Sequence, residues 1–377
     1  MTTSDLQAAL APEPRLLLAA VRLPHDDNAG QLVPELAQDA DVHRLLELGR
    51  RHAVLPLCCY NLREAGLLQD LPEGLRAGLR DAYDASLART THIAALLGTV
   101  LDRAAETGLS LLCLKGPILA EQCYPHPSTR PMTDVDLLVR QADLGRAETL
   151  LAEAGYEPLP ATANPVYVRG PADGEGMWDL QVELHTELLT GALGNRKVAR
   201  LETRHVWERA QEAALMGRPC LSLSTADNII FLGAHMTVHH GKIRLIWLAD
   251  LAYFLRARGD SVRWEEVVEA AARYGVRPAV GWPLRLAREL VGANVPEDVL
   301  LDLRAGPQHA CPARFLEPST YFGDVPMPGG DPGVLGRAMF LEHWRDRFFY
   351  FAEVARAAGP AAWPSLACRF LRAAVKK

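Results

Sequence analysis

The segment 111–140, LLCLKGPILAEQCYPHPSTRPMTDVDLLVR, constrains the fold and chemistry of this chain more than any other part of it. Its second apolar run opens with Asp134 and Asp136, separated by a single valine. Side chains alternate along a strand, so the two carboxylates share one face, with backbone origins about 7 Å apart. Burying two charges in an apolar strand is costly unless a cation or a structural ion pair compensates. We interpret the pair as a site for Mg²⁺ or Mn²⁺, which shares its oxygen ligands with substrate phosphates.

A third acidic residue lies in the run QVELH. Strand alternation places Gln181, Glu183 and His185 on one face and Val182 and Leu184 on the other. A carboxylate on a neighbouring strand would complete a triad, where it could bind a metal or accept a proton from an attacking hydroxyl. The structural alternative is a half-exposed strand whose polar residues face water.

The pair Lys115-Gly116 follows an apolar run and precedes a helical segment that starts with Pro117. Glycine lets the backbone approach a phosphate, and a proline suits the first turn of a helix. Lys115 could therefore hold a triphosphate, and the alternative is a tight turn with a solvated lysine. Arg130, just upstream of the two aspartates, has two candidate partners, a phosphate or an aspartate.

Three histidines, His235, His239 and His240, lie on a predicted helix. The spacing between His235 and His239 suits zinc, but no glutamate follows the first histidine as it does in metalloproteases. Asp250 on the next predicted helix could be a partner. Metal binding, contact with substrate or phosphate, and structural hydrogen bonding all remain open at this point.

Periodicity predicts an α+β fold in three regions. Residues 1–92 are expected to be helical, 93–215 to form a small mixed sheet with helices, and 216–377 to be helical again. A stretch rich in proline and glycine, 306–335, indicates a long loop or linker. For the aromatic C-terminal segment, a helix pair that covers the core competes with a helix on a membrane surface.

Charge and cysteine usage restrict the function classes. A formal net charge of −6 argues against a broad nucleic-acid-binding surface, although a local basic groove could exist. The seven cysteines show no CxxC spacing, which argues against a disulfide framework or zinc ribbon and favours a reduced, cytoplasmic protein. The N-terminus lacks the features of a signal peptide, and we expect no membrane insertion.

In combination, these motifs resemble a mostly uncharacterised family of bacterial nucleotidyltransferases, from the superfamily that shares the catalytic core of DNA polymerase beta. The resemblance runs from about residue 40 to 260 and rests on LLCLKG, Tyr124, Arg130-Pro131, DVDLLV, VELH, the histidine-bearing helix and LIWLADL. It implies a small mixed sheet and two Mg²⁺ ions, bound by Asp134 and Asp136 as the paired carboxylates and Glu183 as the third acid.

Two departures from the superfamily pattern accompany the resemblance. Lys115-Gly116 stands where the superfamily usually has Gly-Ser, whose serine commonly contacts the triphosphate. Glu183 stands where an aspartate is common, and its longer side chain could reposition the second metal.

The expected activity is transfer of a nucleoside monophosphate from an NTP, such as ATP, to an acceptor hydroxyl or phosphate. Lys115, Gly116 and Arg130 would hold the triphosphate, while His185, His235 and His239 would line the acceptor side. The acidic balance favours a small molecule, peptide or protein as acceptor over RNA. Two alternatives remain: a nucleotide-binding scaffold of the same fold that has lost turnover, and a glycosyltransferase with a DxD motif.

Overall fold

Helices and one mixed sheet make up the chain in the computed structural model, which describes residues 10–23, 25–160, 165–170, 180–188, 203–240, 243–304 and a few positions between 340 and 350. The predicted linker 306–335 and most of the C-terminal segment lie outside the described residues. None of the described helices combines the length and the apolar character needed to cross a membrane.

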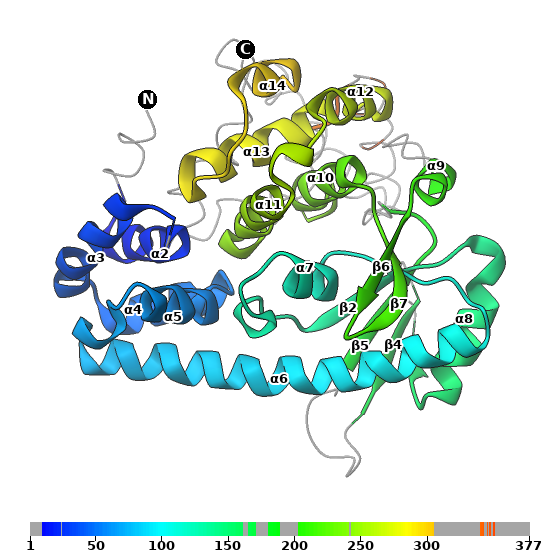
Figure 1. Ribbon diagram of the computed structural model, residues 1–377, viewed down its shortest axis with the longest axis horizontal. Helices are drawn as coiled ribbons and strands as arrows, with labels where there is room; N and C mark the ends of the chain where they lie inside the picture. Colours follow the sequence, from blue (N-terminus) through cyan, green and yellow to red (C-terminus); the bar gives the residue numbers. More distant parts are fainter. Residues whose placement is uncertain are drawn as a thin grey trace, which may run out of the picture.

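The N-terminal helices pack together at one end of the molecule (Figure 1). Asp26 and Asp41 each accept hydrogen bonds from backbone N–H groups of the helix that follows, which fixes where those helices begin. This group comprises α2 (Pro12–Arg22), α3 (Asp27–Asp39), α4 (Val42–Arg51) and α5 (Leu55–Glu64).

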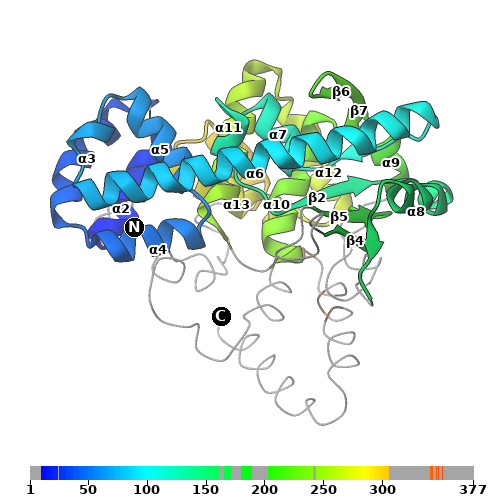
Figure 2. The ribbon, with the colours of Figure 1, turned by 90° about the horizontal axis from the view of Figure 1, so that it is seen from below.

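The long helix α6 (Glu73–Glu106) joins this group to the sheet. It runs along one side of the molecule, from the N-terminal helices to α8 (Leu144–Glu153) (Figures 1 and 2). It packs against α5 at one end and against α8 and strand β7 (Arg218–Ser222) towards the other. The helix α6 thus contacts both the N-terminal helices and the region of the sheet.

Within the described ranges, a mixed seven-stranded sheet forms the centre of the fold, in the order β3-β4-β5-β2-β1-β7-β6. The pairs β2–β5 and β1–β7 are parallel, and the other neighbours are antiparallel. The strands are β1 (Leu112–Cys113), β2 (Asp134–Leu138), β3 (Glu157–Pro158), β4 (Val166–Arg169), β5 (Leu180–His185), β6 (Gln211–Leu215) and β7 (Arg218–Ser222).

Short α7 (Gly116–Gln122) follows β1 and contacts β2 and α11 (Leu245–Arg258). The C-terminal helices lie on the opposite side of α7 from α6 (Figure 1). They also contact the N-terminal group, where Asn61 donates a hydrogen bond to the Tyr253 hydroxyl at 3.2 Å. The remaining helices are α9 (Thr203–Glu208), α10 (Thr225–Ala234), the π-helix η4 (His235–His239), α11 (Leu245–Arg258), α12 (Trp264–Tyr274), α13 (Arg277–Val291) and α14 (Glu297–Asp302).

The α+β architecture expected from the sequence is confirmed: a mixed sheet flanked by helical regions. The hairpin β6–β7, which extends the sheet beyond residue 215, was not predicted from the sequence. The predicted region boundaries fall inside α6 and at this hairpin, so the division into 1–92, 93–215 and 216–377 stays a prediction.

Candidate active site

Two neighbouring strands bring the predicted acidic residues together. β2 and β5 pair in parallel, with Asp136 opposite Glu183 and Asp134 opposite Gln181. Val135 and Val182 point to the other face, where both are fully buried. The alternation expected from the sequence therefore places Asp134, Asp136 and Glu183 on one face of the sheet.

Asp136, Glu183 and His185 form a compact cluster on that face. The Nε2 atom of His185 lies 3.0 Å from Oδ1 of Asp136 and 3.5 Å from Oε1 of Glu183. One ligand atom from each of the three residues lies within 4.8 Å of the others. Asp136 is only 4% exposed, whereas Glu183 is half-buried. The cluster thus offers two carboxylates and an imidazole to a cation, with Glu183 open to solvent.

Lys115 balances the charge of this cluster. Its Nζ atom lies 2.9 Å from Oδ2 of Asp136, in an ion pair in which both side chains are largely buried. Burial opposes ionisation of Asp136, but Lys115 and the hydrogen bond from His185 outweigh it and hold the pKa of that carboxyl well below its ordinary value. Asp136 is therefore ionised at neutral pH and able to bind a cation.

The backbone of Lys115 adopts a conformation that favours glycine, with φ +26° and ψ −121°. A non-glycine residue in such a sparsely populated region costs about 1–3 kcal/mol and persists where the surroundings enforce it. The resemblance aligns Lys115 with the glycine of the superfamily's Gly-Ser pair. The positive φ at this position explains why glycine is the usual residue there. Here the chain retains a lysine at the strained position, and its ammonium reaches Asp136.

Gly116 and Asp134 border the other side of the turn. A Cβ atom added to Gly116 would meet Nη1 of Arg130 at 3.7 Å and the Asp134 carbonyl oxygen at 3.8 Å, which are ordinary contacts. A serine would therefore fit at this position. The Asp134 side chain accepts a hydrogen bond from Thr133 at 3.1 Å and is half-buried. Its participation in a metal site stays a prediction.

Lys115 also contacts the histidine-bearing helix. Its Nζ atom lies 2.8 Å from Nε2 of His235. An ammonium group only donates, so Nε2 accepts and the neutral ring carries its proton on Nδ1. Burial, reinforced by the positive charge of Lys115, lowers the pKa of His235 well below its ordinary value. A continuous polar network therefore runs from Glu183 and His185 through Asp136 and Lys115 to His235.

His239 and His240 extend this network towards solvent. The rings of His235 and His239 stack with centroids 5.0 Å apart, and His240 meets His235 edge-on at 4.4 Å. His239 and His240 are half-buried. Lys115 and Asp136 link His185 to the histidine-bearing helix, and the expectation that His185, His235 and His239 line one acceptor site stays a prediction.

Of the two partners considered for Arg130, the structure shows an aspartate. Its guanidinium donates from Nε to Oδ1 of Asp250 at 3.0 Å and from Nη2 to Oδ2 at 2.8 Å. Tyr124 donates to the same carboxylate at 2.7 Å, and all three side chains are buried. The Asp250 carboxylate thus accepts from Arg130 and Tyr124, and its suggested partnership with the histidines stays a prediction. The pair ties α11 to the loop that precedes β2.

Comparison with known proteins adds one family. Residues 38–292 match the model of a family described as an uncharacterised nucleotidyltransferase. The match covers every residue of the polar network, from Lys115 to His240, and the Arg130–Asp250 pair. No curated protein matches the chain.

Proposed function

The chain belongs to this uncharacterised nucleotidyltransferase family, and we propose that it moves a nucleoside monophosphate from an NTP to an acceptor hydroxyl or phosphate with the help of Mg²⁺. One observation carries the proposal: Asp136 and Glu183 stand opposite each other on adjacent parallel strands, with Asp134 on the same face. That arrangement supplies the three carboxylates that the family resemblance assigns to metal binding.

The donor atoms suit a divalent cation. Carboxylate oxygens are the ligands that Mg²⁺ prefers, and Mn²⁺ also accepts an imidazole nitrogen. Asp136, Glu183 and His185 bring such atoms within 4.8 Å of one another. Asp136 and Glu183 would hold the ion, with Asp134 contributing from the open side. A bound divalent cation would neutralise phosphate charge and lower the pKa of an acceptor hydroxyl.

Lys115 would have two positions in this proposal. In the structure its ammonium compensates the charge of Asp136. A cation at Asp136 makes that compensation unnecessary and repels the ammonium, so Lys115 would turn to the oxygens of the triphosphate. The lysine would then replace, with a charged donor, the hydroxyl that the superfamily's serine supplies.

Glu183 and His185 would serve the acceptor. Glu183 is the more exposed carboxylate of the cluster, and it would accept the proton of the attacking hydroxyl as general base. His185 lies between the two carboxylates and would orient both. The acidic chain favours a small molecule, peptide or protein as acceptor over RNA. We expect the protein to act in the cytoplasm.

A second candidate function is nucleotide binding without turnover. The ion pair between Lys115 and Asp136 favours it, because a lysine that remained on Asp136 would keep the cation out. Such a protein would bind an NTP and release no pyrophosphate.

The experiment measures pyrophosphate release. The full-length protein is incubated with each labelled NTP, with Mg²⁺ or Mn²⁺, and with pooled metabolite, peptide and protein acceptors. Labelled product is then sought on the acceptors and on the chain itself. We expect pyrophosphate release that Asp136→Asn and Glu183→Gln each reduce by about 10²–10⁴-fold, a typical range for loss of a positioned catalytic group.

The matched control is Asp39→Asn, which removes the same charge from an exposed position at the end of α3. It should leave the rate unchanged. Full turnover in Asp136→Asn would refute the proposed site. NTP binding by calorimetry without pyrophosphate release, whatever the acceptor, would favour the second candidate function.

A further inference from the structure

The three histidines converge because the helix that carries them changes its hydrogen-bond register. The N–H of His240 donates to the carbonyl of His235 at 3.0 Å, five residues back, in the π-helix η4. In an α-helix, residues five apart point about 140° away from each other. The wider π turn brings His240 round beside His239, so both face His235. Such turns are rare and occur frequently at functional sites.

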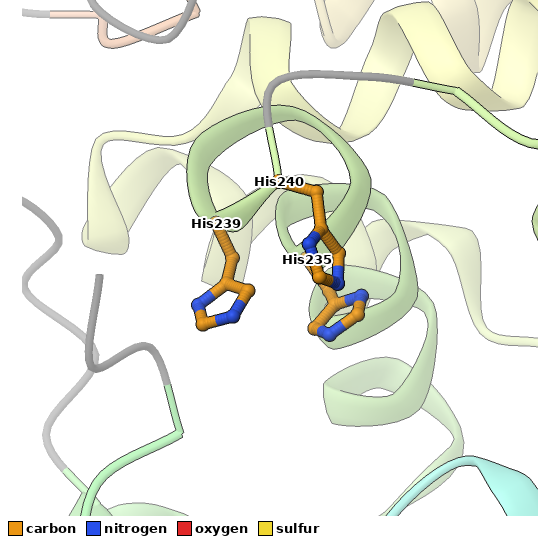
Figure 3. A group of neighbouring side chains, drawn as sticks. All are labelled: His235, His239 and His240. Atoms are coloured by element: carbon orange, nitrogen blue, oxygen red, sulfur yellow. The ribbon is translucent and has the colours of Figure 1, made fainter. Parts of the chain in front are cut away.

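Figure 3 shows the consequence for the side chains: the imidazoles of His235, His239 and His240 leave this turn on the same side. One ligand nitrogen from each lies within 4.8 Å of the others. In a tetrahedral zinc site with bonds of about 2.0–2.1 Å, ligand nitrogens lie about 3.4 Å apart. Modest side-chain rotations would therefore close these rings on one ion.

We propose that His235, His239 and His240 form a second metal site, separate from the carboxylate cluster, for a transition-metal ion of the Zn²⁺ class. The donors decide the class of ion. Three imidazoles suit Zn²⁺, Co²⁺, Ni²⁺ or Cu²⁺, whereas Mg²⁺ requires oxygen. Nothing in the nucleotidyl-transfer proposal uses this ion.

Trp247 packs against two of the rings, stacking on His240 and meeting His235 edge-on with centroids 5.8 Å apart. His240 stacks on Trp247 with centroids 4.7 Å apart and an interplanar angle of 13°. Within the π turn, the Thr237 hydroxyl donates to the carbonyls of Gly233 at 3.0 Å and of Ala279 at 3.1 Å. The contacts with Trp247 limit rotation of the rings, and the Thr237 hydrogen bonds fix the backbone turn that carries the histidines.

The exposure of the rings provides access. His235 is buried, while His239 and His240 are half-buried. An ion would enter from the side of His239 and His240 and keep a position open for water, as in zinc sites with three protein ligands.

Lys115 competes for the same imidazole. Its ammonium lies 2.8 Å from Nε2 of His235, so an ion bound through that nitrogen would have to displace it. The ammonium has Asp136 as a second partner at 2.9 Å and can stay there. Removing its charge should therefore strengthen metal binding by the histidines, an effect that ring stacking alone would not produce.

The test uses Co²⁺, whose intense visible bands report four-coordinate binding. Tag-free full-length protein is treated with a chelator, titrated with Co²⁺ and then with Zn²⁺ as competitor. We expect the intense bands to saturate at one Co²⁺ per chain and to disappear when Zn²⁺ displaces it. His239→Ala and His240→Ala, both at half-exposed positions, should each weaken binding at least about tenfold, or about 1.4 kcal/mol.

Three further variants separate the possible outcomes. His43→Ala, at an exposed position on α4, should leave Co²⁺ binding unchanged, and so should Glu183→Gln, which preserves the ion pair between Lys115 and Asp136. Lys115→Met should tighten it. Absence of Co²⁺ binding, or undiminished binding in the His239 and His240 variants, would overturn the proposal. Loss of binding in the carboxylate variant would overturn it too, since the ion would then occupy the acidic cluster. None of these measurements depends on nucleotidyl transfer.

Discussion

The strained backbone at Lys115 predicts an unusual order of stability for two variants. Lys115→Ala and Lys115→Gly both remove the ammonium and leave Asp136 without that partner. Breaking a buried pair costs about 3 kcal/mol or more, and both variants bear this loss equally. The difference between them isolates the backbone, where φ is +26°.

The size of that difference follows from two opposing terms. Alanine keeps the strain of about 1–3 kcal/mol, because its Cβ atom disfavours this region as lysine does. Glycine relieves the strain but loses about 0.5–1 kcal/mol more conformational entropy on folding. Lys115→Gly should therefore be more stable than Lys115→Ala by about 1 kcal/mol, the reverse of the order in a helix.

Equilibrium unfolding in urea measures the difference, and Ala85 provides a matched control. Ala85 is exposed in the interior of α6, where Ala85→Gly should destabilise by about 1 kcal/mol. If glycine in place of alanine raises the free energy of unfolding at position 115 and lowers it at position 85, the strained conformation of residue 115 is established. If Lys115→Gly is the less stable variant, by an amount similar to Ala85→Gly, the reasoning about strain is refuted.

Two further predictions concern buried charges. Asp250→Asn weakens the bidentate pair with Arg130 and leaves a buried guanidinium short of a charge partner, so it should lower the free energy of unfolding by about 3 kcal/mol. Asp102→Asn, in a more exposed pair, should lower it by less than about 1 kcal/mol, and equal losses would contradict this. The folded state holds the pKa of Asp136 below the unfolded value of about 3.9, so the stability from its ionised form is present above that pH and lost as pH falls through the folded pKa. The stability difference between the wild-type chain and Asp136→Asn should therefore shrink below about pH 3.9 in acid-unfolding curves, and a difference constant with pH would contradict the shift.

The sequence predicted which residues share a face because alternation is local. In QVELH and DVD, the period of two follows from strand geometry alone. Which strands pair, and in which register, depends on the whole sheet. A slip of one residue would have placed Glu183 opposite Val135 and not Asp136. The sequence thus predicted which face of its strand each acidic residue occupies. It did not predict the strand pairing that brings Asp136 and Glu183 together.

The missed hairpin had a local signal. A glycine follows Met216 at the turn between the two strands, where both turn residues have positive φ, 52° and 73°. The π turn had none. Its hydrogen-bond register accompanies close packing around Gly233, where an added Cβ would lie 3.0 Å from the Cα of Val280. Contacts between distant segments of this kind cannot be read from a helical period.

The sequence did not predict the partners of the charged residues either, and Lys115 is the most consequential example. Spacing placed it near the aspartates, but only the fold puts one ammonium between Asp136 and His235, at 2.9 and 2.8 Å. The same charge compensates an ionised carboxylate and repels a cation from the imidazole. If both proposals hold, a metal at either cluster removes one of the two contacts of Lys115, and metals at both remove the two together. The ammonium would then be left for the triphosphate, so occupancy of the histidine site would raise the affinity for NTP through Lys115 and would not do so in Lys115→Met.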